Sequence, residues 1–183
     1  MLNIVQITAF SPKLLNLQDK DIAKYFGKKS NHIYKYGEWV CLEDKKGTEI
    51  KIFKTGIIES EKTFDDLKVK DELTRISKDI KRISTNLFGV NPIYNVLISQ
   101  NPDKCKKIFE KINNNKNIKA LSLTFRKKLH VELRIDKYKC QISMIGISDT
   151  NDIITIYNGI VNDNEETLKM LNLEHMSITE SVF

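Results

Sequence analysis

Three ionisable residues at alternating positions, His130, Glu132 and Arg134, form the part of this chain best suited to chemistry. They alternate with apolar residues between positions 129 and 135, so a strand here has one apolar face and one ionisable face. A second apolar run follows and ends in a small polar bend, GISD, at residues 146–149. A histidine beside a second ionisable group, with this bend behind it, can form a compact site. The same alternation is typical of a strand whose polar face is simply solvated, and both interpretations stay open.

Motifs for nucleotide binding, nucleophilic hydrolysis and metal binding are absent from the sequence. It has no Gly-rich phosphate loop, no GxGxxG after a strand and no GxSxG. Its 3 histidines lie far apart, and its 3 cysteines form no CxxC pair. We therefore expect no metal, no cofactor and no disulfide framework. The cysteine usage favours a reducing compartment.

The opening residues, MLNIVQITAF, lack a basic segment and predict a strand rather than a signal peptide. No stretch of the chain approaches the roughly 18 apolar residues that span a bilayer. We therefore expect an intracellular, cytoplasmic protein without a membrane partner, and a nuclear location stays open.

The net charge of +6 mildly favours a polyanionic partner, and two basic groups could contact it. The first group adjoins His130 in the sequence and consists of Arg126, Lys127 and Lys128. We expect nucleic acid, with DNA favoured, to contact this group. The second group recurs at helical spacing and consists of Arg75, Lys78 and Arg82. It suits either a row of phosphate contacts or a solvated helix face, and the acidic residues among them favour the solvated face.

The first half of the chain predicts a strand, a hairpin and one long helix. The strand covers residues 2–10, and the hairpin lies between residues 33 and 56 around the connection at 44–47. The helix is predicted over residues 60–88, with Thr63 as its N-cap and Gly89 as its stop.

The second half predicts closely spaced strands with one helix near its start. That helix begins at Pro102 and is capped by Asn101. Strands are predicted over residues 93–99, 118–125, 129–135, 139–147 and 153–157, and a short helix over 165–173. This order predicts an α/β or α+β domain in which helices flank a β-sheet of mixed strand direction. No internal repeat is detected in the sequence.

Residues 90–170 resemble the phospholipase D-like superfamily, and within it the restriction-endonuclease branch. The resemblance rests on a strand–helix–strand order followed by LHVELRI, where the family has His-x-Lys, and by MIGISDTN, where it has a Gly-Ser-x-Asn turn. Downstream, NGI and NDNEE are similar to the segment that follows the turn in that branch.

The chain is then a single domain over residues 1–183. It comprises a strand-and-hairpin region (1–58), a long helix (60–88) and a phospholipase D-like core (90–173).

The resemblance implies a phosphoryl nucleophile at His130 and further site residues at Ser148, Asp149 and Glu165. The family's lysine falls on Glu132 and its asparagine on Asp149, so two carboxylates replace groups that hold the phosphoryl charge. Like charges 4 Å apart repel by roughly 4 kcal/mol at an effective dielectric constant near 20. We therefore expect the chemistry to be lost.

Three functions follow from these observations. The first is a noncatalytic, phospholipase D-like pseudoenzyme that binds nucleic acid or assembles with other proteins. Because domains of the family usually pair, a homodimer or a catalytic partner is expected. The second is a nuclease or phosphodiesterase that uses His130 with a rearranged set of neighbours. The third is a protein-binding inhibitor or adaptor whose basic charge is incidental.

Overall fold

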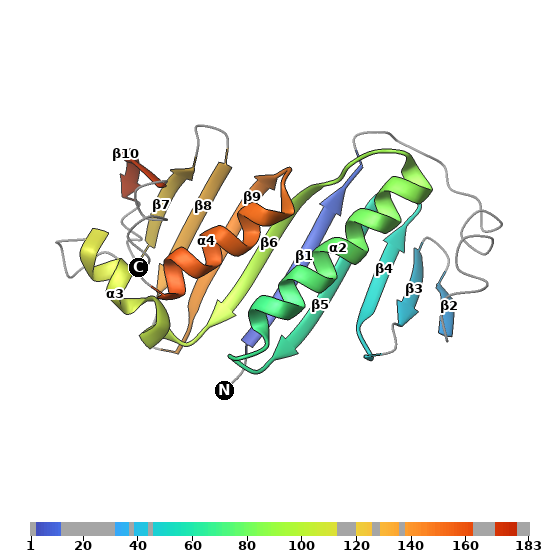
Figure 1. Cartoon of the computed structure of the whole chain (residues 1–183), viewed down its shortest axis with the longest axis horizontal. Helices are drawn as coiled ribbons and strands as arrows, with labels where there is room; N and C mark the ends of the chain where they lie inside the picture. The colour runs from blue at the N-terminus through green and yellow to red at the C-terminus, as the bar shows by residue number, and fades with distance from the viewer. Residues whose placement is uncertain are drawn as a thin grey trace.

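The described part of the chain forms one ten-stranded sheet and three helices (Figure 1). The computed structural model describes residues 3–11, 32–36, 39–43, 46–112, 120–125, 129–135, 138–162 and 171–178. The strands are β1 (Asn3–Phe10), β2 (His32–Tyr36), β3 (Trp39–Glu43), β4 (Glu49–Phe53), β5 (Ile57–Phe64), β6 (Ile93–Gln100), β7 (Ala120–Phe125), β8 (Leu129–Ile135), β9 (Cys140–Ile147) and β10 (Leu171–Ile178). The helices are α2 (Val69–Phe88), α3 (Pro102–Ile112) and α4 (Thr150–Asn162). None of these helices is long and apolar enough to cross a membrane.

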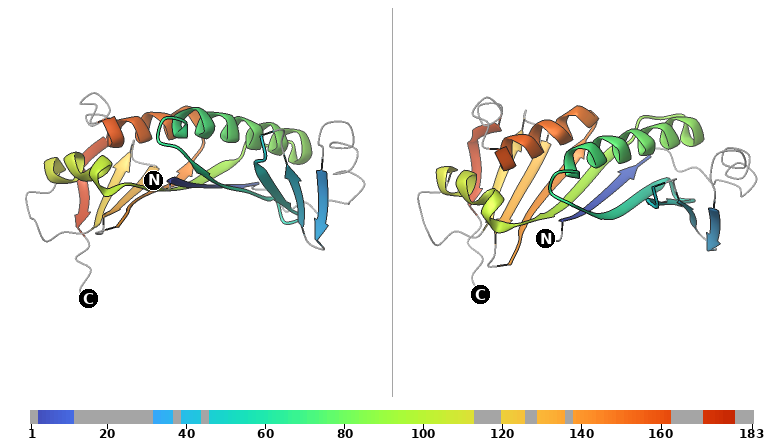
Figure 2. Two further views of the ribbon diagram at one scale, coloured as in Figure 1. Left: turned by 90° about the horizontal axis from the view of Figure 1, so that it is seen from below. Right: turned by 60° about the horizontal axis from the view of Figure 1, so that its bottom comes forward.

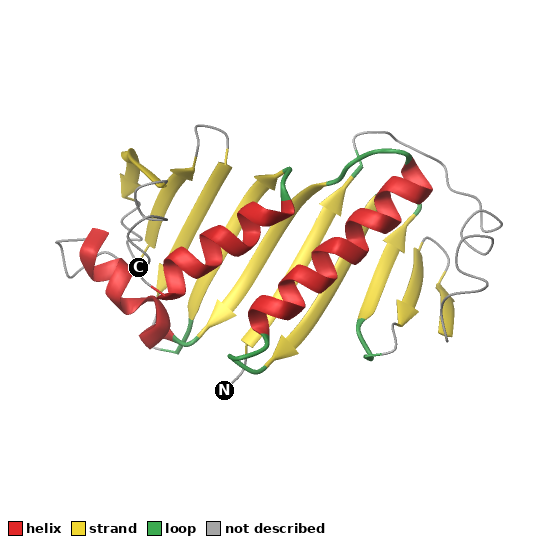
Figure 3. Cartoon of the chain, viewed as in Figure 1, coloured by secondary structure: helices red, strands yellow, loops and turns green. Residues whose placement is uncertain are grey.

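All three helices lie on the same face of the sheet, as Figures 2 and 3 show. No described element lies over the other face, which we call the open face. The strands alternate accordingly: in β1, Val5, Ile7 and Ala9 are buried under the helices, whereas Gln6 and Thr8 lie on the open face. Burial of each large aliphatic side chain contributes about 1.5–3 kcal/mol, so the core between helices and sheet stabilises the two-layer arrangement.

The sheet consists of two five-stranded halves whose four inner strands repeat one order. The outermost strands differ, because β2 precedes β3 in the chain whereas β10 follows α4. From the centre outward, the first half runs β1, β5, β4, β3, β2 and the second runs β6, β9, β8, β7, β10. β1 and β6 pair antiparallel in the middle, which relates the halves by an approximate two-fold axis perpendicular to the sheet. Helix α2 follows β5 and helix α4 follows β9, so each half has its long helix at the same place. The structure thus contains a topological repeat that sequence comparison within the chain did not detect.

Several local predictions are confirmed. Helix α2 ends at Phe88 and is followed by Gly89, whose φ of 68° is the left-handed conformation that favours glycine after a helix. Helix α3 begins at Pro102, and the side-chain Oδ1 of Asn101 accepts the backbone N–H of Asp103 at 3.0 Å, as an N-cap does. The described strands between residues 93 and 147 (β6 to β9) are neighbours in one sheet, with α3 on the helical face.

The start of the long helix was predicted wrongly, because residues 57–64 form strand β5. Ile58, Ser60 and Phe64 of this segment are buried, whereas Glu59 and Glu61 lie on the open face. The period of two and the pairing with β1 along the whole strand override the helical pattern that begins further on. Thr63 therefore lies within β5, and α2 begins only at Val69.

The strand predicted over residues 153–157 lies instead inside helix α4. The apolar side chains that α4 buries recur at spacings of three and four, which is the helical period. They are Ile153, Ile156, Tyr157 and Ile160. A strand also replaces the end of the helix predicted over 165–173, because β10 begins at Leu171. Residues 163–170 of that prediction lie outside the described part of the chain.

The predicted α+β class is confirmed, but the strand directions differ from the mixed sheet expected from the sequence. All nine pairings between neighbouring strands are antiparallel. Strands β2 to β5 and strands β7 to β9 follow one another through connections of only a few residues, which are too short for a parallel crossover of a dozen or more residues.

Candidate functional site

His130, Glu132 and Arg134 share the open face of β8, as the alternation in the sequence predicted. Leu129, Val131 and Leu133 are buried on the helical side of the same strand. Arg134 donates a hydrogen bond from Nε to Oε1 of Glu132, so these two residues form an ion pair. The carboxylate at the position where the resemblance expects a lysine is therefore ion-paired with Arg134.

The polar bend after β9 gives Asp149 a position at the start of α4. His130 pairs with Ile145 across the strands, and Asp149 lies four residues further along, beyond Gly146, whose φ is positive. Asp149 precedes α4, and its Oδ1 accepts the backbone N–H of Asn151 at 2.9 Å. This is the geometry of an N-cap, so Asp149 has a structural task at the start of α4. Ser148 is exposed beside it.

Glycine is required in the same bend. Gly146 has a φ of 80°, and its N–H donates to the side-chain Oδ1 of Asn95 at 3.2 Å. Among the described residues, no group of three or more His, Cys, Asp and Glu side chains is placed to hold a metal ion. Glu165, the remaining candidate catalytic residue, lies outside the described residues.

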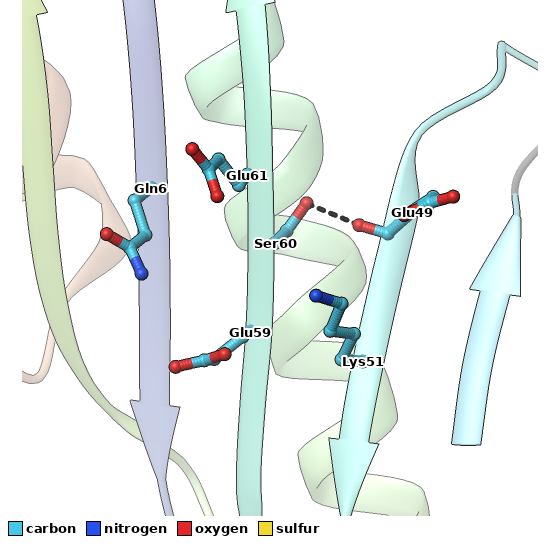
Figure 4. A pocket seen from close by; sticks show the side chains of 6 residues that line it. All are labelled: Gln6, Glu49, Lys51, Glu59, Ser60 and Glu61. Carbon is cyan, nitrogen blue, oxygen red and sulfur yellow. Dashed lines mark hydrogen bonds between the residues drawn. The ribbon is translucent and has the colours of Figure 1, made fainter. Parts of the chain in front are cut away.

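Two hollows on the open face bring together side chains that the sequence did not single out as a group. The first, of about 150 Å³, lies in the first half of the sheet and is drawn in Figure 4. It is lined by Gln6, Glu49, Lys51, Glu59, Ser60 and Glu61. The second, of about 210 Å³, lies in the second half. It is lined by Leu97, Glu132, Arg134, Gln141 and Ser143.

The strand registers show that the two hollows occupy equivalent places. Gln6 of β1 and Leu97 of β6 pair with each other at the centre of the sheet. Outward from them, Gln6 pairs with Glu61 of β5, and Leu97 pairs with Ser143 of β9. Glu61 and Ser143 therefore correspond to each other.

The same correspondence continues on the next strands. Lys51 of β4 pairs with Glu59 of β5, and Arg134 of β8 pairs with Gln141 of β9. Lys51 and Arg134 are thus equivalent cations, and each follows a glutamate by two residues. The sequence does carry a trace of this repeat, in EIKI at 49–52 and ELRI at 132–135.

The middle of the open face is uncharged and partly apolar. Its polar side chains on the central strands are amides and hydroxyls, such as Gln6, Thr8 and Asn95. Several large apolar side chains are exposed there, and Phe10 and Ile93 pair with each other. The exposed fractions are 37% for Phe10, 43% for Ile93, 37% for Leu97 and 45% for Ile145. Exposed apolar side chains that gather on one face are typical of a binding surface.

Cys41 lies next to the first hollow but is unsuited to nucleophilic chemistry. It pairs with Lys51 across β3 and β4 and is 4% exposed. Burial, followed by the charge of Glu49, raises the pKa of its thiol above the ordinary value. The reactive thiolate form is therefore disfavoured.

The predicted basic row on α2 is separate from the open face and is largely engaged in ion pairs. Arg75 Nε donates to Glu72 at 2.6 Å, and Arg82 lies 3.1 Å from Asp79. Lys78 is exposed on the helical layer. This arrangement agrees with a solvated helix face. Residues 126–128, the basic group beside His130, lie outside the described residues.

Comparisons with known proteins find a likeness in structure but none in sequence families. No family model and no curated protein matches the chain. Among solved structures, the Methanococcus jannaschii TBP is similar, with 13% sequence identity and a TM-score of 0.36. The match covers 92% of this chain and 96% of that chain. At this level of similarity no function is transferred from that protein to this one.

Proposed function

We propose that this is a noncatalytic protein that binds double-stranded nucleic acid across the open face of its sheet. The observation that carries the proposal is the pair of equivalent hollows, each with one cation, on either side of an uncharged, partly apolar centre. A duplex has two antiparallel strands related by local two-fold axes, so two equivalent protein surfaces can contact its two backbones alike.

The dimensions of the face suit this ligand. Lys51 on β4 and Arg134 on β8 are separated by five strand spacings. At about 4.8 Å per spacing they lie about 24 Å apart perpendicular to the strands, which is about seven base-pair steps of 3.4 Å. The strand registers offset them by four residues, about 13 Å, along the strands. In this proposal each cation contacts the phosphates of one strand.

The centre of the face would contact the bases. Gln and Asn side chains can hydrogen-bond to base edges in the minor groove, where proteins also insert apolar side chains between base steps. Gln6, Asn95 and Gln141 supply the amides, and Phe10 and Ile93 supply an apolar pair at one end of β1 and β6. Binding of this kind requires no phospholipase D-like ancestry, and that resemblance remains a hypothesis.

The absence of catalysis is part of the proposal. His130 has neither the lysine nor the asparagine of the family beside it. Glu132 is paired with Arg134, and Asp149 caps α4. A carboxylate near neutral pH is an acceptor only, so neither can donate a hydrogen bond to a transferring phosphoryl group.

A second candidate function, binding of a basic protein segment, is favoured by one observation. The first hollow contains the three carboxylates Glu49, Glu59 and Glu61 against the single ammonium of Lys51. Such a surface suits a partner rich in lysine or arginine. The homodimer or catalytic partner expected from the sequence for the nucleic-acid-binding protein remains a prediction.

Titration of a fluorescent duplex at several salt concentrations tests the proposal. The variants are Lys51→Ala and Arg134→Ala, and the control is Lys78→Ala, which removes an exposed lysine from the opposite layer. Each of the first two should weaken binding about fivefold, because an exposed charge contact contributes about 1 kcal/mol. Each should also reduce the salt slope by about 0.9.

The outcomes separate the candidates. If Lys78→Ala weakens binding and the other two variants do not, the ligand contacts the helical layer and the proposed surface is wrong. If the wild type binds no duplex at low salt but binds a poly-lysine peptide, the second candidate replaces the first. Circular dichroism of each variant checks that the fold is retained.

A further inference from the structure

The two equivalent hollows differ in charge at two positions on the strand next to the centre. Where the second half has Gln141 and Ser143, the first half has Glu59 and Glu61. The flanking pairs do not add to the difference, because Glu49 with Lys51 matches Glu132 with Arg134. The first hollow thus carries three carboxylates and one cation, a net charge of −2, and the second carries one of each, a net charge of 0.

The two additional carboxylates lie where a ligand on the open face would meet them. Figure 4 shows Glu59 and Glu61 on β5, between Gln6 of β1 and Lys51 of β4. Glu61 is exposed and Glu59 is partly exposed on that face. A phosphate group above the first half is therefore repelled more strongly than one above the second half.

We infer that Glu59 and Glu61 determine the orientation in which the protein binds a duplex: the second half lies over the part of the backbone with more negative charge. This inference rests on the proposed function, because it concerns the same open face. It makes binding directional on any duplex whose backbone charge is uneven, although the sheet is nearly two-fold symmetric. Two unit charges that act through water at about 8 Å give an orientation preference of about fivefold at low salt.

A duplex with unequal halves tests the inference. In one half the phosphates are replaced by uncharged methylphosphonates, and a fluorescent acceptor is attached to either end. The donor is placed on a cysteine introduced by Tyr138→Cys, in the connection between β8 and β9 of the second half. Tyr138 is 83% exposed, whereas Cys41, Cys105 and Cys140 are buried, so labelling is selective.

The expected result is stronger energy transfer to the acceptor on the charged end, with the two orientations populated about five to one. Exchange of the charges between the halves should reverse this ratio. The exchanged variant is Glu59→Gln, Glu61→Ser, Gln141→Glu and Ser143→Glu. A fully charged duplex is the control and should show no preference for either end.

A milder variant guards against misfolding of the fourfold exchange. Glu59→Gln with Glu61→Gln removes only surface charge, and it should abolish the preference while strengthening binding. Equal transfer to both ends in the wild type, or a preference that the charge changes leave unaltered, would overturn the inference while duplex binding itself stands. Failure of every variant to bind any duplex would overturn the proposed function as well.

Discussion

Replacement of Asp149 distinguishes its structural role from the catalytic role that the family resemblance implied. Asp149→Ala removes the acceptor of the Asn151 N–H, a bond of 2.9 Å at the first turn of α4. Loss of such a cap costs about 1 kcal/mol, and loss of the negative charge at the helix N-terminus adds about 0.5 kcal/mol. Helix α4 buries Ile153, Ile156, Tyr157 and Ile160 against the rest of the core, so this cost reaches the whole fold.

The total of about 1.5 kcal/mol should lower the melting temperature by about 3–6 °C for a chain of this length. Asp149→Asn keeps a capping oxygen and loses only the charge, so it should cost about 0.5 kcal/mol. Urea denaturation followed by circular dichroism measures both values, and Ser148→Ala, a change at the exposed neighbouring residue, is the matched control. If Asp149→Ala proves as stable as the wild type, or if Asp149→Asn loses as much as Asp149→Ala, the capping argument is refuted.

Two further predictions concern catalysis and alkaline stability. The protein alone should not cleave a labelled duplex or single strand in EDTA, and cleavage that disappears in His130→Ala would make it an enzyme. Tyr94 is fully buried, and burial raises the pKa of its hydroxyl above the ordinary value of 10.0. Because the pKa of Tyr94 is higher in the folded than in the unfolded chain, its hydroxyl ionises first in the unfolded chain. The contribution of Tyr94 to stability is therefore fully present below pH 10 and is lost as the pH rises above 10. The free energy of unfolding should therefore fall by about 1.4 kcal/mol per pH unit above 10 from this residue. Tyr94→Phe should remove that slope in denaturant titrations, while costing about 1 kcal/mol at neutral pH through the lost hydrogen bond to the Ser77 carbonyl. An unchanged slope in Tyr94→Phe would contradict the assignment.

The sequence was sufficient wherever a single local pattern prevailed. The alternation over 129–135 predicted β8 and placed His130 and Glu132 on one face, as observed. Asn101 with Pro102 predicted the start of α3, and Gly89 predicted the end of α2. These features depend on side-chain periodicity and on the backbone preferences of single residues, which neighbouring positions already contain.

The sequence failed where pairing with a distant strand decided between two local patterns. Residues 57–64 became a strand because β1 lies beside them, although more than forty residues separate the two in the chain. Residues 153–157 became helical because their apolar side chains pack on the sheet through a helical stripe. In both segments the tertiary environment overrode a weak propensity.

The candidate binding surface belongs almost entirely to the tertiary structure. The sequence determined that Glu132 and Arg134 share a strand face, and EIKI and ELRI were present in it as a faint repeat. The antiparallel pairing of β1 with β6 is what places β4, with EIKI, and β8, with ELRI, at equivalent positions on either side of the middle of the sheet. The location of all three described helices on one side is what leaves the other face of the sheet open. A strand specifies which of its residues point the same way, because that follows from local geometry. Contacts between residues far apart in the chain determine which strands pair and which face the helices cover. These contacts therefore determine the strand register and which side chains line the two hollows.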